Sequence, residues 1–205
     1  MRGLKELLDD PFFDLLETGA EEARRSMRLL AGFLESKSQD LSAFASSKRD
    51  SDRIAADIDA RLARTIKASL RKEDIQALSR GLRRITESVE RLAERFHLVK
   101  DQAGGLEFTR LAPLLERAAN GLVNIVSQLR GAGDITQTKH THAQIQAASE
   151  EVEELTEAWL QDCYRRESDP VRIVAAKDLL ERVQGLLQRC CECAELVDEI
   201  VLTYC

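Results

Sequence analysis

Apolar residues recur along this chain with the spacing of an α-helix. In the clearest run the steps between them alternate between three and four residues, so the side chains share one face of a helix. The run consists of Ile75, Leu78, Leu82, Ile85, Val89, Leu92, Phe96 and Val99. This unbroken seam predicts one helix over residues 73–100.

Five further segments have the same amphipathic character. They cover residues 11–36, 44–69, 107–130, 143–165 and 170–202. Each of the three prolines stands where a helix can begin, and Asp10-Pro11 and Asp169-Pro170 pair an N-capping carboxylate with a proline in the first turn. No segment alternates like a β-strand. The pattern predicts an all-α protein whose six long helices pack as an antiparallel bundle.

The second half of the chain repeats the hydrophobic pattern of the first half. When the sequence is shifted by 101 residues against itself, the apolar positions of two consecutive helices match without a gap. The matches include Leu78 with Leu179, Leu82 with Val183, Ile85 with Leu186, Ile54 with Leu155 and Ile58 with Trp159. We therefore predict a single domain over residues 1–205, made of two three-helix repeats at about 11–103 and 107–205.

Composition and charge limit the function classes. The 205 residues carry 36 acidic and 30 basic side chains, a formal net charge of −6. This balance argues against general nucleic-acid binding, because affinity for a duplex comes mainly from neutralising phosphates. No run reaches the roughly 20 apolar residues that a membrane span requires, and the N-terminal segment lacks the apolar core of a signal peptide. We expect a cytoplasmic protein that contacts the inner membrane peripherally at most.

Three of the five cysteines lie within four positions, at Cys190, Cys191 and Cys193. A structural zinc site needs about four converging ligands, and the chain has no second C-x-x-C. Under the 101-residue shift, Cys190, Cys193 and Cys163 fall on seam positions, where a reduced thiol packs as a small hydrophobic group. We predict these three in the core and Cys191 nearer the surface, with a metal or redox site as the alternative.

Three stretches together resemble a known family. They are DSDRIAADIDARLARTI at 50–66, LRKEDIQALSRGLRRITESVERLAE at 70–94, and SDPVRIVAAKDLLERVQGLLQRCCECAELVDEIV at 168–201. Their order and spacing are similar to the PhoU-like family, and more closely to the branch of cytoplasmic accessory proteins of Pit-type inorganic phosphate transporters. The resemblance implies two three-helix repeats and a non-enzymatic regulator of phosphate transport, with a Pit-type transporter as its partner.

The resemblance also identifies candidate metal ligands. The wider family carries carboxylates spaced i, i+4 on two helices of each repeat, and facing helices together hold a cation. The matching positions here are Lys48 and Asp52, Arg83 and Glu87, Ser149 and Glu153, and Gln184 and Gln188, with Glu150 and Glu154 one residue out of register. A divalent or transition metal would thus have Asp52, Glu87, Glu150, Glu153 and Glu154 as candidate ligands.

The same positions offer a second interpretation without a metal. Lys48 and Arg83 place positive charge where the family has carboxylates, so internal salt bridges can replace the cation, and Arg83 can pair with Glu87 one turn along its own helix. We therefore expect no bound cofactor. Glu94-x-x-His97 has a ligand spacing known from di-iron bundles but no second copy, and His140 and His142 are expected in a loop or at a helix start.

Basic residues crowd the junction between the second and third predicted helices. The candidate partner-binding residues are Arg61, Arg64, Lys67, Arg71, Lys72 and Arg84. Such a cluster on an acidic protein suits an acidic protein loop or anionic lipid headgroups, and the alternative is an ordinary charged helical surface. No catalytic motif is present, so we expect no enzyme. A helical adaptor for an unrelated partner and a carboxylate metal-binding bundle are the alternative functions, and a homo-oligomer stays open.

Overall fold

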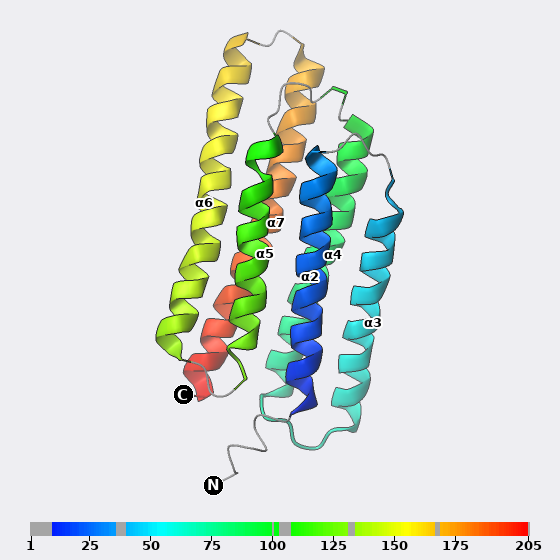
Figure 1. Cartoon of the computed structure of the whole chain (residues 1–205), viewed down its shortest axis with the longest axis vertical. Helices are drawn as coiled ribbons and strands as arrows, with labels where there is room; N and C mark the ends of the chain where they lie inside the picture. The colour runs from blue at the N-terminus through cyan, green and yellow to red at the C-terminus, as the bar shows by residue number, and fades with distance from the viewer. Residues whose placement is uncertain are drawn as a thin grey trace.

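Six α-helices make up nearly all of the described chain (Figure 1). The computed structural model describes residues 10–35, 40–99, 101–102, 108–130, 134–166 and 169–204. The helices are α2 (Pro11–Glu35), α3 (Ser42–Arg64), α4 (Lys72–Val99), α5 (Ala112–Ser127), α6 (Ile135–Arg166) and α7 (Pro170–Tyr204), with the short 3-10 helix η1 (Phe108–Arg110) before α5. These ranges contain no strand, which confirms the all-α bundle predicted from periodicity.

The helices pack as two groups of three. Helices α2, α3 and α4 contact one another, as do α5, α6 and α7. Helix α2 packs against α5 and helix α4 against α7, and these two contacts join the groups. Within the described ranges α3 contacts only α2 and α4, and α6 contacts only α5 and α7, so these two helices form the outer flanks (Figure 1).

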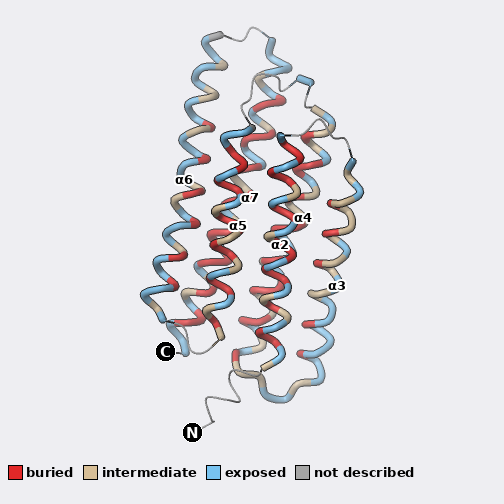
Figure 2. The backbone as a smooth tube through the Cα atoms, viewed as in Figure 1, coloured by how far each residue is buried: buried red, intermediate tan, exposed pale blue. Residues whose placement is uncertain are grey.

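The buried side chains follow the predicted seams. From Ile75 to Phe96, every residue of the α4 seam is at most 6% exposed, and Val99 at its end is partly buried. Figure 2 shows buried positions recurring along every helix, and on the outer helices α3 and α6 they lie on the side that faces the bundle. Phe33 of α2 packs edge-to-face on Phe44 of α3 and Phe96 of α4, with ring centroids 5.2 and 5.6 Å apart. Burial of this continuous apolar surface is the main force that holds the helices together.

Three aspartates begin helices by capping free backbone amides. Asp10 Oδ1 accepts from the Phe12 amide at 3.0 Å, and Asp169 Oδ1 accepts from the Val171 amide at 2.9 Å, as the Asp-Pro pairs predict. Asp10 Oδ2 also accepts from the Ser69 amide at 2.8 Å, which ties the α3–α4 connection to the start of α2. The third cap, Asp134, starts α6 well before the predicted residue 143.

The early start of α6 corrects the expectation for two histidines. His140 and His142 lie inside the helix, not in a loop. The hydroxyls of Thr138 and Thr141 donate to backbone oxygens four residues earlier, so threonines that interrupt the apolar pattern are buried at little cost. The signal was Asp134 followed three residues later by Gln137, which is the sequence signature of a capping box.

Helix α3 is shorter than predicted. It ends at Arg64 rather than near residue 69, because Thr65 takes an extended backbone conformation (φ −89°, ψ 128°). Residues 65–71 then connect to α4 at one end of the bundle. Four glycines favour breaks between the helices, because glycine interrupts a helical pattern. These residues, Gly104, Gly105, Gly131 and Gly133, lie outside the described residues, as do the N-terminal segment before residue 10 and Cys205. Within those residues no helix has both the length and the apolarity to cross a bilayer.

Candidate functional site

The α3–α4 face holds the first pair of candidate metal-ligand positions. Asp52 on α3 contacts two cations: Lys48 Nζ lies 3.1 Å from Oδ2, and Arg83 Nη1 of α4 lies 3.3 Å from Oδ1. Both carboxylate oxygens of Asp52 therefore have a positively charged partner. The geometry is that of the internal salt bridges expected from Lys48 and Arg83 in the sequence.

Glu87, the second candidate ligand on this face, has a different partner from the one expected. The sequence suggested a pair with Arg83 on the same helix, and this was wrong. Glu87 Oε1 instead accepts from Arg91 Nη2 at 2.5 Å. Arg83 extends across to α3, while a glutamate four residues before a basic residue is the favoured orientation along a helix. Asp52 and Glu87 are thus both neutralised by side chains of the bundle.

Further carboxylates lie around Lys48. The hydrogen bond and charge of Asp52, followed by the charges of Glu90 and Glu87, raise the pKa of Lys48. Burial raises the pKa of Glu90, the charge of Lys48 opposes this rise, and Glu94, Asp52 and Glu87 add to it. Lys48 therefore occupies the centre of a small acidic region between α3 and α4. Nowhere in the described ranges do three or more His, Cys, Asp or Glu side chains converge as a metal site would require.

The remaining metal-ligand candidates lie on the opposite flank of the molecule. Glu150, Glu153 and Glu154 are exposed on α6, and Glu150 Oε1 accepts from Gln146 Nε2 at 3.0 Å. The facing helix α7 offers Gln184 and Gln188, which are uncharged. Because α3 and α6 are the two outer flanks (Figure 1), these glutamates are not brought together with Asp52 and Glu87.

The six basic candidates separate into two places. Arg61 and Arg64 in the last turn of α3 and Lys67 in the following connection are exposed at one end of the bundle. Arg71 and Lys72 lie at the same end, but each has an internal partner. Arg71 donates to both oxygens of Asp74, at 2.8 and 3.1 Å, and Lys72 Nζ donates to the Leu62 carbonyl at 3.0 Å. The sixth residue, Arg84, lies further along α4, in a pocket facing α7.

Apolar side chains accompany the basic residues at this end. Ile66 is 92% exposed between Arg64 and Lys67. We call Arg61, Arg64, Ile66 and Lys67 the basic tip. The C-terminal part of α7 lies beside it, because the Tyr204 hydroxyl accepts from the Arg71 amide at 2.5 Å. The sequence did not mark Ile66 as an exposed residue, because the helix predicted over residues 44–69 included it.

The cysteines form part of the core. Cys190 and Cys193 are buried, and the Cys190 sulfur contacts the Met27 sulfur at 3.8 Å. Burial raises the pKa of Cys190 well above its ordinary value and that of Cys193 to about 12, so both are neutral thiols. Two expectations were wrong. Cys191 is only 7% exposed because α6 covers it near Ser149, and Cys163 is only partly buried.

The histidines do not form a metal-binding group. His142 Nδ1 lies 2.5 Å from Asp198 Oδ2, which links α6 to α7 in a partly buried pair. His97 is partly buried on α4, while Glu94 of the same E-x-x-H motif is exposed. His140 is exposed and lies 3.1 Å from Gln144 on its own helix.

Comparison with known proteins gives a clear likeness at the level of the fold. No protein-family model matches the chain, and no curated protein sequence matches it significantly. Among solved structures, the crystal structure of a PhoU-like protein from Shewanella oneidensis MR-1 superposes with a TM-score of 0.75 and 13% sequence identity. The match covers 94% of this chain and 99% of that chain. The chain therefore has a PhoU-like fold.

Proposed function

We propose that this protein is a non-enzymatic regulator of inorganic phosphate transport that acts by contact at the cytoplasmic face of the membrane. The observation that carries the proposal is the likeness of nearly the whole bundle to a protein described as PhoU-like. The sequence stretches at 50–66, 70–94 and 168–201 resemble the accessory proteins of Pit-type phosphate transporters, which supports the same assignment. The proposed partner is such a transporter in its membrane.

The basic tip is the surface proposed to make this contact. Its three cations stand out on a chain of net charge −6, and Ile66 adds an apolar side chain that is 92% exposed. Anionic lipid headgroups and acidic cytoplasmic loops attract basic residues, and an apolar side chain can enter the headgroup region. Arg61, Arg64 and Lys67 have no hydrogen bond or ion pair between side chains within the described residues, so binding would not require an internal pair to break.

The first experiment measures binding to vesicles containing anionic lipid and the cognate transporter. Each basic residue near an anionic surface contributes about 1 kcal/mol, so the Arg61→Gln/Arg64→Gln/Lys67→Gln variant should bind about a hundredfold more weakly at low salt. The loss should shrink at high salt, where charges are screened within about a Debye length. A matched variant, Arg49→Gln/Arg53→Gln/Arg165→Gln, removes the same charge from exposed sites elsewhere and should bind nearly normally.

The second experiment connects binding to transport. Uptake of labelled inorganic phosphate is measured in source cells that carry the wild type, the tip variant, the matched variant or no copy. We expect the tip variant to behave like the strain without the protein, and the matched variant like the wild type. Equal uptake in all four strains would disprove a role in phosphate transport. If tip-dependent membrane binding persisted in that case, the protein would be a helical adaptor for another partner.

A further inference from the structure

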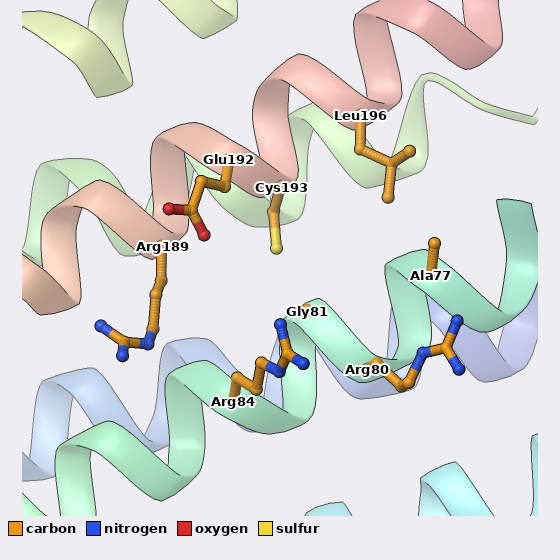
Figure 3. A pocket seen from close by; sticks show the side chains of 8 residues that line it. All are labelled: Ala77, Arg80, Gly81, Arg84, Arg189, Glu192, Cys193 and Leu196. Atoms are coloured by element: carbon orange, nitrogen blue, oxygen red, sulfur yellow. The ribbon is translucent and has the colours of Figure 1, made fainter.

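A pocket of about 320 Å³ lies between α4 and α7, and no residue of the basic tip lines it (Figure 3). The two helices approach each other closely at one point of this pocket, and the space lies around that point. Gly81 of α4 faces Cys193 of α7 so closely that a Cβ at Gly81 would lie 2.6 Å from the sulfur. On one side of this contact the small side chain of Ala77 faces the partly buried Leu196, and on the other side lie Arg189 and Glu192 of α7 (Figure 3).

Three arginines line this pocket from both helices. Arg80 and Arg84 come from successive turns of α4, and Arg189 comes from α7. In Figure 3, Arg189 extends from α7 toward α4, and the guanidinium of Arg84 lies beside Gly81 in the gap between the helices. The charge of Arg84 also lowers the pKa of Cys193 against the larger effects of burial and Glu192, which agrees with a guanidinium close to that sulfur.

The positive charge of the pocket is largely unneutralised. Glu192 is its single carboxylate, so the lining has a formal charge of about +2. The side chains of Arg80 and Arg84 make no hydrogen bond or ion pair with any other described residue, although the backbone carbonyl of Arg84 accepts from the Ser88 hydroxyl. Arg189 uses one nitrogen, Nη1, which donates to the Gly185 carbonyl at 2.6 Å. The neighbouring Arg83, in contrast, is paired with Asp52 on the opposite side of α4.

We infer that the pocket between α4 and α7 binds a phosphate group, held by Arg84 and Arg189, while Arg80 adds positive charge on the other side of Gly81 (Figure 3). Guanidinium groups donate paired hydrogen bonds that match phosphate oxygens, and they stay charged at every physiological pH. A phosphate monoester carries a charge of about −1.5 to −2 near neutral pH, which balances the charge of the lining. The volume is at the lower end of the roughly 300–1,000 Å³ of small-molecule sites, so free phosphate or a small phosphate ester can enter.

The inference does not depend on the proposed function, because its test uses only the purified chain. Isothermal titration calorimetry at fixed ionic strength measures binding of inorganic phosphate, glycerol phosphate and sulfate. We expect saturable binding of at least one phosphate compound and weaker binding of sulfate. Tighter binding of inorganic phosphate would identify the free ion as the ligand, and tighter binding of the ester a small phosphorylated molecule.

Two variants test whether the arginines hold the ligand. A hydrogen bond to a charged group contributes enough that Arg84→Gln and Arg189→Gln should each lower the affinity about tenfold to a hundredfold. Arg61→Gln at the basic tip removes the same charge elsewhere and should change the affinity less than twofold. Circular dichroism and urea unfolding verify that each variant is folded. The inference is overturned if wild type binds no phosphate compound, binds sulfate equally well, or keeps its affinity in both pocket variants.

Discussion

The contact between Gly81 and Cys193 makes a sharp prediction about packing. A Cβ at Gly81 would lie 2.6 Å from the Cys193 sulfur, whereas ordinary van der Waals contact begins near 3.4 Å, and no other described side chain lies within 4 Å. Overpacking of this kind typically costs about 1–3 kcal/mol, while replacing glycine by alanine within a helix gains about 1 kcal/mol. Gly81→Ala should therefore lower the free energy of unfolding by about 1 kcal/mol.

The sign of this effect should reverse once the sulfur is removed. Cys193→Ala alone deletes one buried heavy atom and should cost about 1 kcal/mol. In that background the new methyl group at position 81 enters the vacated space, so Gly81→Ala should stabilise the protein by about 1 kcal/mol. The coupling between the two sites would then be about 2 kcal/mol, within the range seen for residues in direct contact.

Urea unfolding of the wild type, both single variants and the double variant measures this cycle. Far-ultraviolet circular dichroism and the fluorescence of the single tryptophan, Trp159, should report the same transition, which justifies two-state free energies. Gly32→Ala is the matched control, because a Cβ there meets nothing within 4 Å and should only stabilise α2. Equal destabilisation by Gly81→Ala in both backgrounds would refute the close approach of α4 and α7.

Three further predictions concern polar contacts. Burial would raise the pKa of Asp178, but its bonds to Arg95 and Arg182 outweigh burial and lower it, so Asp178→Asn should cost about 1 kcal/mol at neutral pH. The bonds to Arg95 and Arg182 stabilise the folded protein only while the Asp178 carboxylate is ionised. The difference in unfolding free energy between wild type and variant, measured by urea titration, should therefore disappear as the pH falls below 3.8. Asp134→Ala removes the cap of α6 and should cost about 1 kcal/mol, with faster hydrogen exchange confined to the first turns of that helix. Lys48→Glu should give the α3–α4 face measurable manganese affinity by calorimetry, whereas elemental analysis of the wild type, purified without chelators, should find no stoichiometric metal.

Much of the fold follows from patterns that are local in the sequence. The seam from Ile75 to Phe96 and the caps at Asp10 and Asp169 were predictable, because helical periodicity and capping depend on residues a few positions apart. The same local chemistry explains the errors at helix ends. No proline marks the end of α3, so its termination at the extended residue Thr65 was not predicted. The first turns of α6 were missed because threonines interrupt the apolar pattern there, and their hydroxyls bond to the helix backbone.

The candidate sites depended on the distances between helices. A long side chain such as Arg83 can reach a partner on its own helix or on a neighbouring one. Because α3 packs on α4, Arg83 pairs with Asp52 of α3, and Glu87 pairs with Arg91 instead. In the same way, Cys191 became buried because α6 covers it. Exposure and pairing are properties of two surfaces, so one helix pattern read alone determines neither.

The long amphipathic helices of this chain, and the first residues of most of them, follow from local patterns in its sequence. Which polar groups meet depends on how those helices pack. Arg80, Arg84 and Arg189 are more than 100 positions apart at their extremes, and they line one pocket because Gly81 allows α4 to approach Cys193 of α7. Helix periodicity is set by covalent geometry and backbone hydrogen bonds within a few residues, whereas the convergence of charges requires the packing of whole helices.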